Sequence, residues 1–448
     1  MNDPDQEYFV QGMHNALISE LQRAGIAVIA RTSVMQYQDS RTTISEIANQ
    51  LGADALIESS VLRSGDNVEI EVRLVDAGTE QYLADPISRS SELRDVVALY
   101  RDLTSAIAEE IRVALTPQAE ARLASAREVD PQAYEAYLRG QFHFQRLTSA
   151  DLDQAEDWLE EALRMDSTYA PAQAGLALVW IGRGQMMIVP PAEASENATI
   201  EAHEAMALDS TVAEVHYAIA LHRAWQEWDW EGAEAAFGKA IEINPDYSQA
   251  RALYSSFLFM LGRPDEARAQ MDRALESDPL NPLIRAFNGF GMYYERRYDE
   301  SVAELEQAIR MDPNNPVAYG NLTTAYYLAG RYDEVLPLTL QFFPGDEELE
   351  AAAERGYAEG GYRAAIRNVA ATLGARPGMS ELMPMFIAGM YAWSGEKESC
   401  LDSLETAYDA HDPSLPYANQ PDFDLVKDDL RWKELRRRMN LPIGAEGD

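Results

Sequence analysis

The chain has 448 residues, of which 46% are apolar and 25% charged, so it is long enough for several domains with apolar cores. Its 37 Lys and Arg residues are outnumbered by 75 Asp and Glu residues, giving a formal net charge of −38. That excess disfavours binding to nucleic-acid phosphates or to an anionic membrane, because both depend on clustered cations, and the single cysteine, Cys400, excludes an internal disulfide.

The first region, residues 1–115, has the pattern of a small α/β domain. Residues 68–75 alternate apolar and charged side chains, which is typical of a strand with one buried face. A Gly65-Asp66 turn before them indicates a hairpin. A short apolar run at residues 25–30 fits a strand that is buried on both faces. We predict strands at residues 25–30, 55–61, 68–75 and 81–84, and helices at residues 44–51 and 91–115.

Four phrases of this region resemble the TolB amino-terminal-like, or FlgO-like, domain of bacterial signalling proteins. They are Tyr8 to Met13, Val28 to Val34, Leu51 to Asp54, and Leu62 to Val68. In that family another strand normally precedes the first phrase, so the resemblance implies an incomplete sheet here. We expect either a longer chain or a second copy, in a homo-oligomer, to supply that strand. In relatives, the upstream segment often carries a winged-helix DNA binder, a class III nucleotide cyclase or a protein kinase.

A repeat of helical pairs follows. Three phrases ending in Pro245, Pro279 and Pro313 are spaced 34 residues apart, and proline ends a helix because it lacks an N–H. Before each proline, a small residue, a bulky residue and an alanine fall at i, i+4 and i+7, which is one face of a helix. These residues are Ala233, Phe237 and Ala240; Ala267, Met271 and Ala274; and Ser301, Leu305 and Ala308.

This pattern resembles the tetratricopeptide repeat family over residues 131–414, with about eight units of which some are degenerate. The resemblance implies a mainly α fold, a right-handed α-solenoid, preceded by the small, incomplete α/β domain. Residues 116–130 would form a connecting helix or linker. Residues 415–448 would form a C-terminal capping segment with a basic cluster from Arg431 to Arg438. This cluster is expected to dock on the last repeat. The alternative, that it binds nucleic acid, fits the acidic background less well.

The family's geometry places a concave wall on the first helix of each unit, and this wall is the candidate binding site. One interpretation is a groove for an extended or helical peptide, anchored by aromatic side chains. The other is that the same aromatics pack against neighbouring repeats or the carboxyl end of the array. The candidate groove residues are Gln249, Ser256, Phe259, Phe290, Tyr293, Thr324 and Tyr327.

The sequence contains none of the common catalytic, nucleotide-binding or metal-binding motifs. The six histidines are scattered, and there is no HExxH, CxxC, GxSxG or P-loop phrase. We therefore expect no catalytic residues, no cofactor and no metal. With no apolar run of the roughly 18 residues that span a bilayer, we also expect no membrane contact. The location would be cytoplasmic, or periplasmic if the chain is part of a membrane-anchored parent.

The functional hypothesis is a non-enzymatic scaffold or sensory module that binds a protein or peptide, without nucleic acid. The alternative is a regulatory fragment of a nucleotide cyclase, or of a winged-helix transcription regulator, whose output domain lies upstream.

Overall fold

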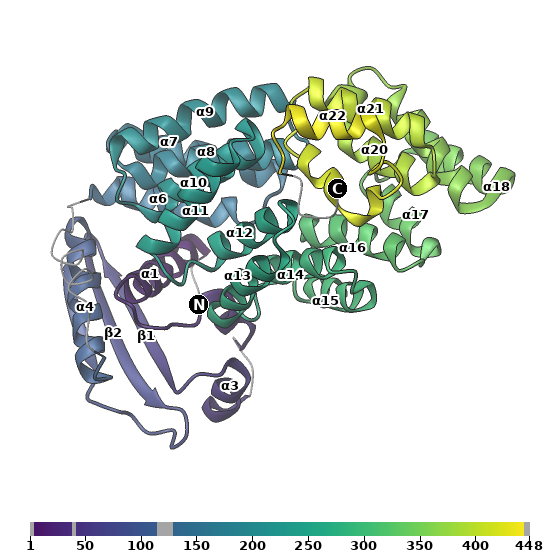
Figure 1. Cartoon of the computed structure of the whole chain (residues 1–448). Coiled ribbons are helices and arrows are strands. Elements are labelled where there is room, and N and C mark those ends of the chain that lie inside the picture. Colours follow the sequence, from purple (N-terminus) through teal and green to yellow (C-terminus); the bar gives the residue numbers. More distant parts are fainter. Residues whose placement is uncertain (1–3, 38–41, 114–128, 443–448) are drawn as a thin grey trace.

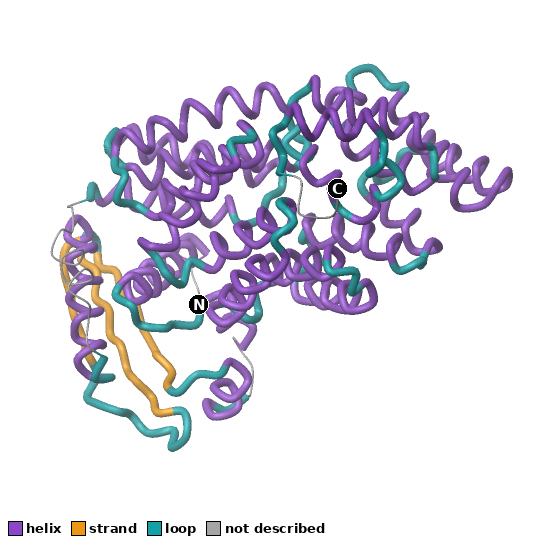
Figure 2. Tube along the Cα trace, viewed as in Figure 1, coloured by secondary structure: helices purple, strands orange, loops and turns teal. Residues whose placement is uncertain are grey.

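The computed structural model describes residues 4–37, 42–113 and 129–442. Figure 2 shows that strands are confined to the N-terminal region and that helices form the rest of the described chain. The expected linker, residues 116–130, lies outside the described residues except for its last two.

The N-terminal region is a three-stranded antiparallel sheet covered by helices. Its strands are β1 (Ala55–Ser64), β2 (Asn67–Asp76) and β3 (Ile87–Glu92), in the order β1-β2-β3. The predicted hairpin is confirmed, since Ser64 pairs with Asn67 across the turn. The helices of this region are α1 (Pro4–Arg23), α2 (Arg31–Val34), α3 (Ile44–Leu51) and α4 (Val96–Glu110).

The apolar side chains of β2 form the core of this region. Val68, Ile70 and Val72 are at most 1% exposed and share one cluster with side chains of α1 and α4. Figure 1 shows α4 running along the sheet, with α1 between the sheet and the repeat array. The alternation in the sequence therefore marked the buried face correctly.

Two predicted strands are wrong. Residues 25–30 form no ladder: Gly25 ends α1 with a φ of 83°, and the Ala30 N–H donates to Ser277 O at 2.8 Å. The last N–H of the apolar run is thus bonded by the carboxyl end of a repeat helix, α13 (Pro264–Ser277), instead of by a sheet. The strand predicted at 81–84 is replaced by β3, with a single bridge between Val75 and Tyr82.

The shift of the third strand has a local cause. Proline at position 86 lacks an N–H and interrupts the returning chain, so continuous pairing starts one residue later, where Ile87 lies opposite Val72. The bridge and the ladder differ in register by two residues. The predicted helix 91–115 is shorter at its start, because residues Leu93–Asp95 form a 3-10 turn before α4.

Beyond residue 129, eight antiparallel helical pairs stack within the described chain, in agreement with the expected solenoid. The first four are α6 (Pro131–Phe144) with α7 (Ser149–Met165), α8 (Ala170–Gln185) with α9 (Pro191–Leu208), α10 (Ala213–Leu221) with α11 (Trp230–Ile243), and α12 (Ser248–Met260) with α13 (Pro264–Ser277). The next two are α14 (Pro282–Tyr294) with α15 (Tyr298–Met311), and α16 (Pro316–Leu328) with α17 (Tyr332–Gln341). The seventh pair is the two halves of α18 (Glu347–Gly374), kinked at Gly360 and Gly361, and the eighth is α20 (Pro384–Ser394) with α21 (Lys397–Asp409), preceded by the short α19 (Met379–Leu382).

The predicted inner faces of the second helices are confirmed. Every one of the nine residues at these positions, from Ala233 to Ala308, is 0% exposed. Close helix approach is required here: a Cβ on Gly289 would lie 2.5 Å from Leu305 Cγ. The first helices start at Asn-Pro steps in two units, where Asn281 and Asn315 accept hydrogen bonds from the first turn.

The C-terminal segment, defined here as residues 410–429, does not continue the stack. It contains two 3-10 turns, Leu415–Asn419 and Pro421–Phe423, and leads into α22 (Leu430–Arg438). Trp230 Nε1 donates to Met439 O at 2.9 Å, so the chain after α22 touches the third helical pair. Figure 1 shows α22, in yellow, returning towards the end of α9. The array is therefore closed on one side by its own carboxyl end.

Candidate functional site: a cavity in the concave wall

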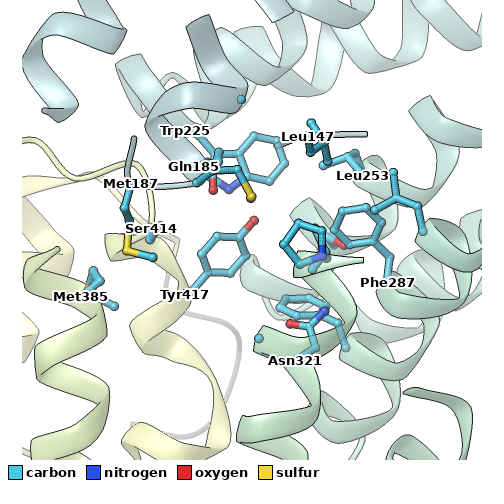
Figure 3. A pocket seen from close by; sticks show the side chains of 18 of the residues that line it. Leu147, Gln185, Met187, Trp225, Leu253, Phe287, Asn321, Met385, Ser414 and Tyr417 are labelled. Atoms are coloured by element: carbon cyan, nitrogen blue, oxygen red, sulfur yellow. The ribbon is translucent and has the colours of Figure 1, made fainter. Parts of the chain in front are cut away.

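The concave wall and the C-terminal segment enclose a cavity of about 580 Å³. Most of its lining comes from the first helices α8, α10, α12, α14, α16 and α20 and from residues between Asp412 and Phe423. The rest comes from residues between Phe144 and Ser149, from Met186 to Ile188, and from Trp225 and Phe342. In Figure 3, Tyr417 points from the C-terminal segment into the middle of the cavity, with Trp225 and Gln185 above it and Phe287 to one side. Residues distant in sequence thus form one site.

The C-terminal segment is held across the wall by hydrogen bonds and ring contacts. Asn419 Nδ2 donates to Met260 O at 3.1 Å, and the Tyr293 hydroxyl donates to Gln420 Oε1 at 3.1 Å. The Tyr417 ring lies edge-on to Phe290, with 5.7 Å between ring centroids. These contacts come from different elements, so they fix the segment along the length of the groove.

Five of the seven residues predicted for the groove line this cavity: Gln249, Ser256, Phe290, Tyr293 and Thr324. The C-terminal segment covers two of them, leaving Phe290 4% and Tyr293 1% exposed. Their rings therefore contact the array's own carboxyl end, which is the second of the two interpretations left open by the sequence.

The other two predicted residues, Phe259 and Tyr327, lie outside the lining. Phe259 is 3% exposed and packs on Tyr294, with 5.7 Å between ring centroids. Tyr327 stacks on Trp393, also at 5.7 Å. Phe259 thus packs against the next unit of the solenoid, and Tyr327 packs against the eighth unit.

Sequence reasoning missed the residues that close the cavity. Trp225 comes from π-helical turns at His222–Glu227, which extend α10 and carry no periodic signal. Asp412, Tyr417 and Asp422 come from the C-terminal segment. The sequence does contain one indication that this segment is not another repeat: Pro416 and Pro421 are incompatible with the interior of a repeat helix.

The lining contains two buried carboxyl groups, those of Asp412 and Asp422. Among the described residues, no Lys, Arg or His lines the cavity. Burial raises the pKa of Asp422 to about 7 and the pKa of Asp412 to about 6. Asp422 Oδ2 accepts a hydrogen bond from Trp393 Nε1 at 3.0 Å, whereas its Oδ1 has no partner. Asp412 Oδ1 accepts from the Ser414 N–H at 2.7 Å.

Part of the basic cluster near the carboxyl end contacts α21, whereas Lys433 and Arg437 are exposed. Arg431 forms ion pairs with Asp402 and Glu405 of α21, both at 2.7 Å. The Arg438 guanidinium lies 3.8 Å from the centroid of the Tyr408 ring, and Trp432 is 0% exposed. Two of the residues considered for a nucleic-acid site, Arg431 and Arg438, are therefore engaged by side chains of α21.

Over the described ranges, no group of three or more His, Cys, Asp or Glu side chains is arranged to hold a metal ion. Over the same ranges, no helix combines the length and the apolar character that crossing a bilayer demands.

Comparison with known proteins identifies the repeats. Residues 224–287 and 292–338 match the model of a tetratricopeptide repeat family. The chain contains tetratricopeptide repeats. A curated relative, the putative adenylate cyclase 3 of Rhizobium meliloti (strain 1021), is 29% identical over 227 residues, which are 50% of this chain and 38% of the relative. The match thus spans well under half of that relative's length.

Two solved structures are similar to part of the chain. A thermophilic tetratricopeptide protein of Thermus thermophilus is 18% identical, with 42% of this chain and 98% of that chain covered and a TM-score of 0.34. The type IV pilus biogenesis factor PilW is 21% identical, with 48% and 97% covered and a TM-score of 0.36.

Proposed function

We propose that the chain is a non-enzymatic scaffold or sensory module of a bacterial signalling protein, which binds a protein or peptide on its concave wall. The observation that carries the proposal is the C-terminal segment itself, a non-repeat stretch of chain held along the wall by side-chain hydrogen bonds to backbone and side chains. Tetratricopeptide arrays offer an extended concave surface for such segments.

The partner would contact the part of the wall that the C-terminal segment leaves accessible. Leu253 of α12 and Leu283 of α14 line the cavity and are only half-buried. Apolar side chains that stay accessible at the edge of a groove are the kind that a peptide buries on binding.

The N-terminal region would be a TolB-like or FlgO-like domain. Its order of α3, the β1–β2 hairpin, β3 and α4 supports this. In the described residues β1 pairs with β2 alone, which leaves its other edge for a strand from a longer chain or a second copy.

A second candidate function is the regulatory part of a nucleotide cyclase or of a winged-helix regulator. The relative named as a putative adenylate cyclase favours the cyclase, since the match covers half of this chain. In that case the gene would encode an output domain upstream of Met1.

Affinity capture from the source organism tests the groove. The double variant Leu253→Arg, Leu283→Arg places two charges on the accessible wall. The matched control Ile200→Arg, Leu208→Arg introduces the same two charges on α9, where the side chains are 49% and 37% exposed. We expect a partner that the unchanged chain and the control recover and the groove variant loses. Equal recovery by all three, with unchanged circular dichroism, would reject the groove.

Sequencing upstream of Met1 and assaying nucleotide conversion separate the two candidate functions. The isolated chain should produce no cyclic nucleotide from ATP and Mg²⁺. Cyclisation by the isolated chain would overturn the scaffold proposal, and an upstream cyclase domain would select the regulatory role.

A further inference from the structure

The cavity behind the C-terminal segment has the size and lining of a small-molecule site. Its volume of about 580 Å³ lies within the range of roughly 300–1,000 Å³ for such sites. Aromatic rings from several elements line it: Tyr217, Trp225, Phe290, Tyr293, Trp393 and Tyr417. A ligand with an apolar body would contact these rings.

The charges of the lining decide which head group the ligand can carry. The described lining holds no Lys, Arg or His to pair with a phosphate or carboxylate, and it holds the carboxyl groups of Asp412 and Asp422. An anion placed here would lose its hydration without gaining a counter-charge. Nucleotides and fatty acids are therefore disfavoured, whereas a cation would find a carboxylate and aromatic faces.

Asp422 lines the cavity and has one carboxyl oxygen without a hydrogen-bond partner. The side chain is 4% exposed, its Oδ2 is bonded to Trp393, and its Oδ1 makes no hydrogen bond. A buried acceptor without a donor costs about 1–3 kcal/mol. Asp412 differs, because the Ser414 N–H already bonds its Oδ1.

We propose that the cavity binds a small molecule with an apolar body and one protonated amine, which donates to the carboxyl group of Asp422. The apolar body lies against the aromatic walls, and the amine lies beside Asp422 in the C-terminal segment. This site shares the lining residues Leu253 and Leu283 with the partner surface proposed above, but the proposal does not depend on that role. A protein partner contacts the accessible rim, whereas the amine occupies the interior.

Three probes with one tail and different head groups test the head-group assignment. Octylamine, 1-octanol and octanoate are titrated into the full chain at pH 7.5 by isothermal titration calorimetry. We expect octylamine to bind at least about tenfold more tightly than 1-octanol, and octanoate to bind most weakly. The variant Asp422→Asn should remove the preference for the amine over the alcohol, while the exposed Asp428→Asn control keeps it.

Two glycine variants test the location. Gly320 lines the cavity on α16, and a Cβ built there meets no atom within 4 Å. Gly238 on α11 also has nothing within 4 Å but lies outside the lining. Leucine at either position improves helix propensity by up to about 1 kcal/mol, so both variants should fold. Gly320→Leu should weaken octylamine binding at least about tenfold by filling the cavity, and Gly238→Leu should bind it normally.

Several results would overturn the proposal: octanoate binding as tightly as octylamine, no binding of any probe, an unchanged head-group preference in Asp422→Asn, or normal octylamine binding by Gly320→Leu. Each is independent of partner capture, so failure here leaves the protein-binding proposal to its own experiment.

Discussion

Asp422 provides a quantitative test of the cavity's electrostatics through the pH dependence of stability. Burial raises its pKa from 3.8 to about 7 in the folded chain. The folded state therefore holds a proton between these values that the unfolded state has released. Stability from this group is complete below pH 3.8, falls as the pH rises, and is lost once the pH passes about 7.

The magnitude follows from the pKa difference. Each pKa unit corresponds to about 1.4 kcal/mol, so raising the pH from 5.5 to 8 should lower the free energy of unfolding by about 2 kcal/mol through Asp422. Proteins are least soluble near their isoelectric point, which is about 4.4 for this chain. The lower pH of the experiment is therefore set at 5.5. The variant Asp422→Asn keeps an oxygen acceptor for Trp393 Nε1 and has no proton to release, so it should be about 2 kcal/mol less sensitive to this pH change.

The assay is urea unfolding of the chain and the variant at both pH values, followed by tryptophan fluorescence. Trp393 donates to Asp422, so its emission reports on the same region. Asp428→Asn, an exposed carboxyl change in the same segment, should follow the unchanged chain at both pH values to within about 0.5 kcal/mol. If Asp422→Asn and the unchanged chain showed parallel pH dependence, Asp422 would be ionised and stabilised in the fold, and the burial argument would be refuted.

Three further changes test the packing. Gly289→Ala should destabilise the chain by about 1–3 kcal/mol in urea unfolding, because the new Cβ would meet Leu305; an unchanged midpoint would show that these helices can separate at no cost. Trp432→Ala should cost about 3–5 kcal/mol and speed hydrogen exchange in residues 410–429, and slow exchange there would show that α22 does not hold this segment. Arg431→Ala should cost less than about 1 kcal/mol, and the loss should shrink in 1 M salt because its ion pairs are partly exposed; a larger, salt-independent loss would contradict a surface ion pair.

The elements that sequence predicted well are those whose contacts are local. In the hairpin, residues 68–75 pair with the strand just before them, and the period-2 pattern marks the buried face. In the array, Ala233, Phe237 and their counterparts pack against the preceding helix of the same unit. Short-range pairing leaves a period in the sequence, which is why both were recognisable.

The features that sequence missed depend on contacts between distant parts of the chain. The apolar run at residues 25–30 has the composition of a strand, yet its last N–H is satisfied by Ser277 O, far along the array. Asp412 and Asp422 resemble ordinary surface acids in a chain with 75 Asp and Glu residues. Only the docking of the C-terminal segment buries them, and no periodic pattern encodes that docking.

The docked C-terminal segment also changes what binding to the concave wall requires. A peptide that took the place of the C-terminal segment would have to expose Leu415, Phe423 and Val426, each at most 2% exposed. Exposing such side chains costs about 1.5–3 kcal/mol each, before any hydrogen bond is counted. A ligand at the rim, or a small molecule in the interior, avoids that cost because the segment stays in place. Partners that bind without displacing the C-terminal segment are therefore favoured by several kcal/mol over partners that compete with it.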